Sequence, residues 1–279
     1  MKNLINSLSI ITVNLNNAEG LRKTIESVLV QSFINFEYII IDGGSTDSSI
    51  DVIQYYSNSI HYWVSEKDNG IYHAMNKGIL SAKGEYLLFL NSGDYLYTTN
   101  TLSDVFSIYH TEDFLCGSSV ISKDDKVIHV TNPPEVHTFL AYYRATISHQ
   151  ATFIKRYLFN LYGLYREDFR YNSDWEFWIR TIILQNCSTR KLSVVICNYD
   201  LNGVSSINSE SEEYKREVQE VLSIPLLQKF VPDYESQWQK KREMAPLYWV
   251  KSKKVLFKLI SFLYKLAGYY NKVKNKIYY

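Results

Sequence analysis

The chain has 279 residues, of which 46% are hydrophobic and 21% charged, and its formal net charge at pH 7 is +1. These proportions exclude disordered, collagen-like and low-complexity chains and allow one large domain or two small ones. The charge is unevenly divided: residues 1–243 hold 22 basic and 29 acidic side chains, whereas the residues after Glu243 hold eight lysines and no acid. A body at −7 and a tail at +8 predict two parts with different partners.

The first half alternates between short apolar runs and helical patterns. Strands are predicted over 8–13, 38–41, 60–64 and 86–90. Helices are predicted between them through 21–29, 50–53 and 71–80. This alternation indicates a parallel sheet covered on both faces, with ligands beyond the carboxyl ends of the strands. Polar clusters follow three of these strands, at residues 14–17, 42–47 and 91–94, and predict a site at that edge.

The second half is less regular. Asp124-Asp125-Lys126 predicts a hairpin tip, and helical patterns run over 158–165 and 173–184. We expect one domain over 1–225, with a donor-binding half over about 1–98 and an acceptor half over about 99–225, followed by a helical, basic region over 226–279.

Several common motifs are missing from the sequence. It contains no G-x-x-x-x-G-K-[ST], no G-x-G-x-x-G after the first strand and no H-E-x-x-H, which argues against a P-loop kinase, an ordinary dehydrogenase and a zinc hydrolase. Cys116, Cys187 and Cys197 form no C-x-x-C pair, so we expect reduced thiols in a cytoplasmic protein rather than a zinc site or a disulfide framework.

Five segments, in order between about Leu8 and about Arg180, resemble the inverting glycosyltransferases of family 2. They are ITVNLNN at 11–17, ESVLVQS at 26–32, IDGGSTD at 41–47, NGIYHAMNKG at 69–78 and GEYLLFLNSGD at 84–94. The resemblance implies the GT-A fold, a Rossmann-like, mostly parallel α/β sheet with helices on both faces, here followed by C-terminal amphipathic helices. The branch it is most similar to assembles bacterial O-antigen and capsule. That branch implies transfer from a nucleotide-diphosphate sugar, expected to be a UDP-sugar, to a polyprenyl-diphosphate-linked glycan.

A nucleotide-sugar donor presents a base, a ribose and a diphosphate to the strand ends. Thr12 and Asn16 are placed to bind the base, and the resemblance implies that Asp42 accepts from the base or the ribose. Asp68 precedes a helix N-terminus, where phosphate binds favourably. The remaining candidates for donor contact are Asn76, Asn91 and Ser92. The competing interpretation for these polar residues is a turn or helix-cap role.

Residues Asn91-Ser92-Gly93-Asp94 occupy the place of the D-x-D motif, whose acids coordinate Mg²⁺ or Mn²⁺ in this family. Asn91 and Gly93 stand where acids are common, and Asp94 alone remains as an anionic oxygen ligand. We therefore expect either that Asp94 holds Mg²⁺ or Mn²⁺ together with phosphate and water, or that the enzyme depends less on metal. A turn role at the end of a strand is the alternative for Asp94.

An inverting transfer needs a general base that takes the proton of the acceptor hydroxyl. The resemblance places this base at Asp174, with Asp168 and Glu176 as rivals and a helix-terminal acid as the alternative role. His149-Gln150 matches a His-Gln pair of the branch and is expected to line the acceptor or diphosphate pocket. Trp175 is expected to stack on an acceptor sugar, with core packing as the alternative.

The tail places its lysines on one side of a predicted helix. Lys251, Lys254, Lys258, Lys265, Lys272 and Lys276 fall within a sector of about 60°, opposite Trp249, Leu256, Ile260, Leu263, Ala267 and Tyr270. This pattern predicts contact with the anionic inner face of a membrane, where a lipid-linked acceptor would lie. A packing helix or a homodimer contact is the alternative, and nucleic-acid binding is not expected because no recognised module accompanies the lysines.

Two other functional classes remain open. A nucleotidyltransferase would use a similar α/β nucleotide site but attack the α-phosphate. A non-catalytic nucleotide-sugar binding or scaffold protein is compatible with the incomplete D-x-D motif.

Overall fold

The computed structural model describes residues 7–123, 126–143, 145–201, 211–253, 256–259 and 261–265. The chain divides into two compact units, Met1–Val221 and Leu222–Tyr279. This division lies near the predicted boundary at residue 225, but the assignment of donor and acceptor halves within the first unit stays a prediction. The hairpin tip predicted at Asp124 and Asp125 lies outside the described residues, between β6 and β7.

Within the described residues, nine strands form one sheet in the order β3-β2-β1-β4-β8-β6-β9-β5, with β7 paired to β6. The strands are β1 (Leu8–Asn14), β2 (Phe36–Asp42), β3 (Tyr62–Ser65), β4 (Tyr86–Phe89), β5 (Tyr95–Leu96), β6 (Phe114–Lys123), β7 (Lys126–Thr131), β8 (Thr152–Lys155) and β9 (Thr189–Asp200). The predicted α/β sheet is confirmed, and β1 to β4 pair with one another in parallel.

The second half of the sheet is mixed. β8 is antiparallel to both β4 and β6, and β5 is antiparallel to β9, whereas β6 and β9 are parallel. The predicted parallel arrangement therefore ends at β4. The carboxyl ends of β1, β2 and β4 still lie at one edge, because β1 pairs in parallel with both of the others.

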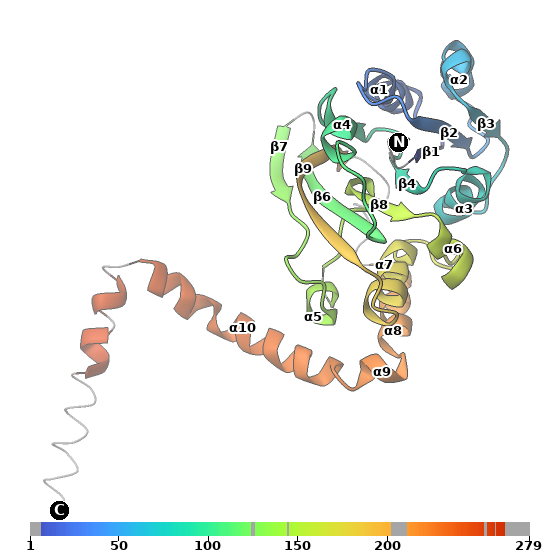
Figure 1. Ribbon diagram of the computed structural model, residues 1–279. Coiled ribbons are helices and arrows are strands. Elements are labelled where there is room, and N and C mark those ends of the chain that lie inside the picture. The colour runs from blue at the N-terminus through green and yellow to red at the C-terminus, as the bar shows by residue number, and fades with distance from the viewer. Residues whose placement is uncertain are drawn as a thin grey trace, which may run out of the picture. The chain divides into compact units, whose positions relative to one another are not determined.

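Helices α1 (Ala18–Leu29), α2 (Ser49–Tyr55) and α3 (Ile71–Ser81) connect the parallel strands. Residues of β1 alternate between the two faces of the sheet. Leu8 and Ile10 belong to a buried cluster that includes α1 and α2 residues, whereas Ile11 meets Gly78 of α3. Figure 1 shows α1 and α2 on one side of the sheet and α3 on the other, as expected for a sheet covered on both faces.

The remaining helices belong to the less regular half. They are α4 (Thr101–Val105), α5 (Phe139–Tyr142), α6 (Tyr157–Tyr162), α7 (Ser173–Trp178) and α8 (Glu212–Leu222), with the short 3₁₀ helix η2 (His149–Ala151). Another short 3₁₀ helix, η1 (Ser57–Ser59), follows α2 in the first half. The helix predicted over 158–165 ends at Tyr162, because Gly163 has φ of 91° and stops the helix. The helix predicted over 173–184 is α7 followed by a π-helical turn, η3 (Ile179–Ile183).

The second unit contains α9 (Pro225–Gln228) and α10 (Val231–Ser252). Helical residues continue over 256–259 and 261–265. Of the predicted amphipathic pattern, Lys254, Ile260, Ala267, Tyr270, Lys272 and Lys276 lie outside the described residues. In the described part of the chain, no helix combines the length and apolarity needed to cross a bilayer.

Gly84, just before β4, packs tightly against the backbone of β1. A Cβ at this position would lie 2.4 Å from the backbone nitrogen of Ser9 and 2.6 Å from the carbonyl carbon of Leu8. We predict that Gly84→Ala lowers the free energy of unfolding by about 1–3 kcal/mol, because the backbone of β1 must shift. Urea unfolding measures the change, with Lys83→Ala at the exposed neighbouring position as the control. Equal stability of the two variants would contradict this packing.

Candidate active site

The carboxylate of Asp42, at the end of β2, organises the loop that follows it. Its Oδ1 accepts from Asn14 Nδ2 at 2.7 Å and from Ser45 Oγ at 2.6 Å. Its Oδ2 accepts from the backbone N–H groups of Gly44 and Ser45, at 3.1 and 2.9 Å, and from Ser65 Oγ at 2.6 Å. One carboxylate thus ties the ends of β1, β2 and β3 together.

Asp42 is fully buried. Burial by itself raises the pKa of its carboxyl, but the hydrogen bonds from Ser45, Ser65 and Asn14 outweigh burial and hold the pKa below its ordinary value. The group is therefore ionised at neutral pH, and its oxygens already accept five hydrogen bonds. The predicted contact between Asp42 and the base or ribose stays a prediction, which would require some of these bonds to be exchanged.

A second set of contacts joins the loops after β1, β2 and β4. Asn16 adopts φ of 51°, and its Oδ1 accepts from the backbone N–H of Thr46 at 2.7 Å. Asn17 caps α1 by accepting from Gly20 N at 3.1 Å, and its Nδ2 donates to the carbonyl of Ser92 at 3.0 Å. The predicted donor residues Asn16 and Ser92 therefore lie on connected loops, where Asn16 is exposed and Ser92 half-buried.

Two other predicted donor residues have internal roles. Thr12 is fully buried, and its hydroxyl donates to the carbonyl of Leu90 at 2.7 Å. Asn76 of α3 is also buried; its Nδ2 donates to the carbonyl of Tyr165 and to Glu167 Oε1, both at 2.9 Å, and its Oδ1 accepts from Tyr165 N. These side chains position the sheet and the segment 165–167, and their contact with a donor stays a prediction.

Asp68 is half-buried just before α3. Its Oδ1 accepts from Gly70 N at 3.0 Å, and its Oδ2 lies so close to Gly43 that a Cβ there would be 2.4 Å away. Gly43 therefore leaves the room that the Asp68 carboxylate occupies. The loops after β2 and β3 meet at this carboxylate, which stays a candidate for donor contact.

Asp174, the predicted general base, lies where four distant segments meet. Its Oδ1 accepts from the backbone N–H of Trp175 at 2.9 Å and lies 3.0 Å from the hydroxyl of Tyr72, which also lies 2.9 Å from the carbonyl of Tyr171. Its Oδ2 lies 2.9 Å from Nδ1 of His149, whose Nε2 lies 3.2 Å from Nδ2 of Asn91. The base candidate is thus connected to the end of β4 through His149.

The protonation states of this group follow from burial and charge. Burial raises the pKa of the Asp174 carboxyl, but the hydrogen bonds from His149, the Trp175 N–H and Tyr72 outweigh it, so that the pKa lies below its ordinary value. Burial and the nearby Asp174 charge raise the pKa of Tyr72 well above its ordinary value. Asp174 is therefore ionised and Tyr72 neutral at pH 7, and 14% of the Asp174 side chain is exposed, so a substrate hydroxyl can approach it.

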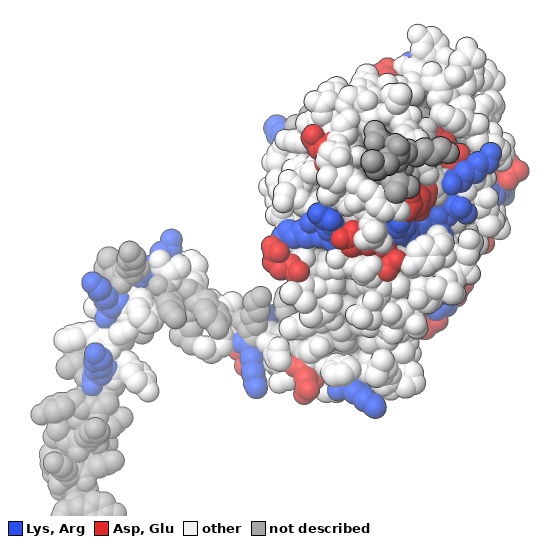
Figure 2. Space-filling view, in the orientation of Figure 1, with Lys and Arg blue, Asp and Glu red and all other residues white. Residues whose placement is uncertain are grey.

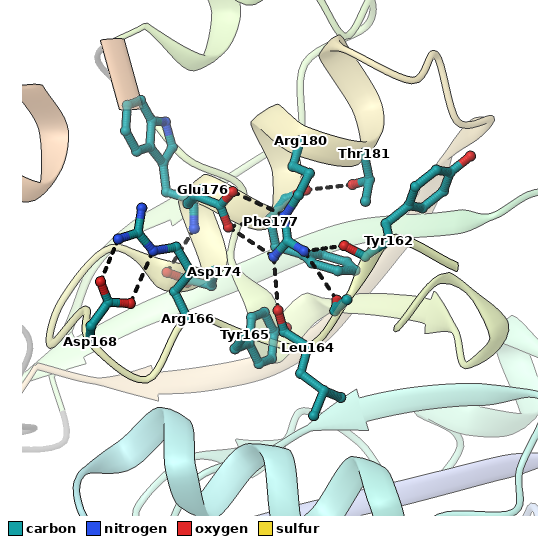
Figure 3. A network of polar contacts seen from close by, with 12 residues as sticks. Tyr162, Leu164, Tyr165, Arg166, Asp168, Asp174, Glu176, Phe177, Arg180 and Thr181 are labelled. Atoms are coloured by element: carbon teal, nitrogen blue, oxygen red, sulfur yellow. Dashed lines mark hydrogen bonds and ion pairs between the residues drawn. The ribbon is translucent and has the colours of Figure 1, made fainter. Parts of the chain in front are cut away.

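The rival carboxylates are engaged elsewhere, as Figure 3 shows. Glu176 accepts from Arg180 Nε at 3.0 Å and from its Nη2 at 2.9 Å. Arg180 also donates to the carbonyls of Tyr162, Gly163 and Leu164, which end α6. Glu176 and Arg180 therefore hold the α6–α7 connection together.

Asp168 is paired with Arg166, and 66% of its side chain is exposed. In the described part of the chain, its carboxylate bonds to Arg166 and not to the strand ends or to Asp174. Of the three carboxylates considered for the base, Asp174 alone is linked by hydrogen bonds to the end of β4.

The remaining predicted acceptor residues are mostly buried. Gln150 accepts from Ser148 Oγ at 2.8 Å and is 5% exposed. Trp175 is 7% exposed, and its Nε1 donates to the carbonyl of Tyr142 at 2.7 Å. This position favours the core-packing alternative for Trp175, because little of the ring is open to an acceptor sugar.

Glu217 of α8 is a site-forming residue that the sequence analysis did not single out. It is fully buried, and its carboxylate accepts from the backbone N–H groups of Tyr171 and Asn172, at 3.1 and 3.0 Å, and from Asn172 Nδ2 at 2.9 Å. The backbone N–H of Arg170 also donates to it. Glu217 thereby fixes the chain just before Asp174, and only its spacing in an amphipathic helix, with buried Val221 one turn later, hinted at an inward position.

The turn over Asn91 to Asp94 does not form a complete metal site. Asp94 is 4% exposed, and its backbone carbonyl accepts from Thr24 Oγ1 at 2.7 Å. Among the described residues, no group of three His, Cys, Asp or Glu side chains could hold a metal ion. A single, nearly covered carboxylate does not fit a resident divalent ion, so no reaction step is assigned to one, and the role predicted for Asp94 stays a prediction.

Polar loops at the carboxyl edge of a mixed α/β sheet, with an ionised and partly exposed carboxylate beside them, form the kind of site at which such sheets bind ligands. Residues 9–169 match the model of glycosyl transferase family 2, so the chain belongs to this family. It is 32% identical over 218 residues to a PGL/p-HBAD biosynthesis glycosyltransferase of Mycobacterium bovis (strain BCG / Pasteur 1173P2), covering 75% of this chain and 82% of the relative.

Solved structures show the same fold. Residues 1–349 of S. aureus TarS in complex with UDP-GlcNAc match with a TM-score of 0.63 and 18% identity, over 78% of this chain and 66% of that chain. The mannosyltransferase PcManGT of Pyrobaculum calidifontis in complex with GDP-Man and Mn²⁺ matches with a TM-score of 0.53 and 17% identity, over 70% of this chain and 57% of that chain. These likenesses confirm the predicted GT-A type of fold.

The five hydrogen bonds to Asp42 generate a stability prediction. In Asp42→Asn, the side-chain NH₂ group replaces one carboxylate oxygen. It cannot accept the hydrogen bonds that this oxygen accepted, so buried donors lose their partners. We expect the free energy of unfolding to fall by about 2–4 kcal/mol, as measured by urea unfolding at pH 7. Asp51→Asn, on the exposed side of α2, is the matched control.

The pH dependence follows from the same carboxylate. Because folding lowers the pKa of Asp42, its stabilising contribution is present above the unfolded pKa and is lost as pH falls through the folded pKa. The difference in stability between wild type and Asp42→Asn should therefore shrink in acid. A difference that stays constant between pH 7 and pH 3 would show that the charge of Asp42 is not what stabilises the loop.

Proposed function

We propose that this family 2 glycosyltransferase transfers a sugar, with inversion, from a nucleotide-diphosphate donor to a lipid-linked glycan in cell-surface polysaccharide synthesis. The single observation that carries the proposal is the position of Asp174. This carboxylate is ionised, partly exposed and joined through His149 to the turn after β4, where donor contact is predicted.

The proposed reaction is a single displacement. The acceptor oxygen attacks the anomeric carbon, the bond to the diphosphate breaks with its electron pair going to the diphosphate, and the hydroxyl proton passes to Asp174. Two of the Asp174 contacts are to Oδ1 and one is to Oδ2, so Oδ2 has room for a further hydrogen bond from an acceptor hydroxyl. Tyr72, Trp175 N and His149 hold the carboxylate in a fixed orientation during this step.

A UDP-sugar is the proposed donor, and the family resemblance together with the UDP-GlcNAc complex of TarS supports it. The GDP-Man complex of PcManGT shows that another neighbour binds a different nucleotide, so a thermal-shift panel of nucleotide sugars is the direct way to identify the donor. The Mn²⁺ in the PcManGT complex supports the proposal that a divalent ion enters together with the donor diphosphate. Titration of the donor with and without Mn²⁺ measures how much the ion adds to donor affinity.

We predict that Asp174→Asn lowers kcat by about 10²–10⁴-fold, because the amide cannot accept the proton. Donor affinity should stay near that of wild type, since Asp174 is proposed to act on the acceptor. Turnover and donor titration measure the two effects. Asp168→Asn, which changes an exposed acid of the same region, is the matched control and should retain activity. Near-normal turnover in Asp174→Asn would exclude Asp174 as the base.

We also propose that the tail contacts the inner face of the membrane, where a lipid-linked acceptor is held. Between residues 256 and 265, Phe257, Leu259, Phe262 and Leu263 are exposed, and so are Lys258 and Lys265. Exposed apolar side chains among lysines, with no acid after Glu243, suit an anionic bilayer. Figure 2 shows acidic and basic side chains interspersed on the drawn face of the first unit.

Truncation after Pro246 should therefore weaken binding to vesicles containing anionic lipid and leave donor affinity unchanged. Co-sedimentation with such vesicles and donor titration are the two measurements. Vesicles of zwitterionic lipid alone are the control for charge. Loss of donor binding on truncation would mean that the second unit contributes to the donor site, and unchanged vesicle binding would contradict the membrane role.

A further inference from the structure

His149 is held from both sides by groups of opposite hydrogen-bonding character. Its Nδ1 lies 2.9 Å from the Asp174 carboxylate, and its Nε2 lies 3.2 Å from the amide nitrogen of Asn91. The three residues come from α7, η2 and the turn after β4, which are far apart in the chain. Only 15% of the His149 side chain is exposed. The imidazole is thus a bridge between the proposed base and the proposed donor loop.

These neighbours select one form of the imidazole. An ionised carboxylate only accepts, so Nδ1 must carry a proton, whereas an amide NH₂ only donates, so Nε2 must be unprotonated. Neutral imidazole with its proton on Nδ1 satisfies both contacts, and the imidazolium satisfies the first alone. Turning the Asn91 amide by 180° would present Oδ1 to Nε2 and favour the imidazolium instead.

We propose that His149 is a positioning residue for Asp174 and that the Asn91 amide keeps its imidazole neutral, with the proton on Nδ1. This inference rests on the proposed function, since it assumes that Asp174 is the base. The neutral imidazole donates to Oδ2, keeps the carboxylate ionised and orients it. An imidazolium at the same place would bind the carboxylate more strongly and make it a weaker base.

The other titratable groups around η2 do not supply a competing charge. Strands β4, β6 and β9 pack against η2. Burial raises the pKa values of Tyr86 on β4, Cys116 on β6 and Cys197 on β9, so all three groups are neutral. Tyr72, on the far side of Asp174, is neutral as well. Asp94 lies three residues beyond Asn91 and is the remaining acid of that turn. Asp174 is thus the anion in direct contact with His149.

The proposal accounts for a departure from the family pattern. Asn91 stands where the D-x-D motif commonly has an acid. A carboxylate at this position would accept from Nε2 and stabilise the imidazolium, whereas an amide donates to Nε2 and stabilises the neutral form. An amide at this position is thus the choice that is compatible with a neutral His149.

Histidine side-chain ¹H–¹⁵N NMR of the full chain tests the inference without turnover. The His149 signals are assigned by their loss in His149→Gln. At pH 7 we expect the neutral form with the proton on Nδ1. In Asn91→Asp we expect the midpoint of the His149 titration to rise by about 1–2 pH units, since an anion would now face Nε2. Asn58→Asp, at an exposed position of η1, should leave the midpoint unchanged.

Kinetics supply the second readout. We expect the acidic limb of the kcat profile to move up in Asn91→Asp by the same amount as the NMR midpoint, with Asn58→Asp unchanged. His149→Gln, which keeps an amide donor for Asp174, should retain about tenfold more activity than His149→Ala and lose the pH dependence that comes from His149.

Two results would overturn the inference. One is an imidazolium, or a proton on Nε2, in the wild type at pH 7, and the other is an unchanged titration midpoint in Asn91→Asp. Because the NMR needs no turnover, its outcome is separate from that of the proposed function. If NMR shows the expected tautomer but the chain transfers no sugar to any acceptor, the transferase proposal is refuted. The hydrogen-bonding assignment of His149 would then still hold.

Discussion

Asp42 and Glu217 are fully buried and Asp174 is largely covered, so each of these carboxylates must be compensated by hydrogen-bond donors, and the site is built around this requirement. Removing a carboxylate from water is costly unless donors replace the lost hydration. Asp42 takes its donors from the last residues of β1 and β3 and from the loop after β2. Asp174 takes them from α3, η2 and its own helix, and Glu217 from the chain before α7. The segments that supply these hydrogen-bond donors are the same segments that form the site.

This requirement distinguishes residues whose polar groups are all bonded within the protein from residues that can still bond to a ligand. Thr12, Asp42 and Asn76 stand at positions predicted to contact the donor, yet their side-chain polar groups are bonded within the protein. Asp174 differs, because its Oδ2 accepts only from His149 among the described contacts and part of its side chain is exposed. A charge that is held firmly and still reachable is what a general base needs.

The sequence predicted the part of the fold that depends on local pattern. The strand predicted over 8–13 is observed over Leu8–Asn14, and the one over 86–90 over Tyr86–Phe89, because apolar runs bounded by turn residues mark buried strands. The insertion of antiparallel β8 between β4 and β6 was not predicted, since pairing between distant strands leaves no local periodic signal. The same holds for Glu217, whose partner Asn172 lies 45 residues away.

The central claim is that Asp174 and the sheet edge carry out glycosyl transfer with inversion. Analysis of the products from the donor that binds most tightly tests this most directly, with NMR reporting the anomeric configuration of the new linkage. The account predicts free nucleoside diphosphate and a linkage of configuration opposite to that of the donor. Pyrophosphate as the released product, or a linkage that keeps the donor's configuration, would contradict it.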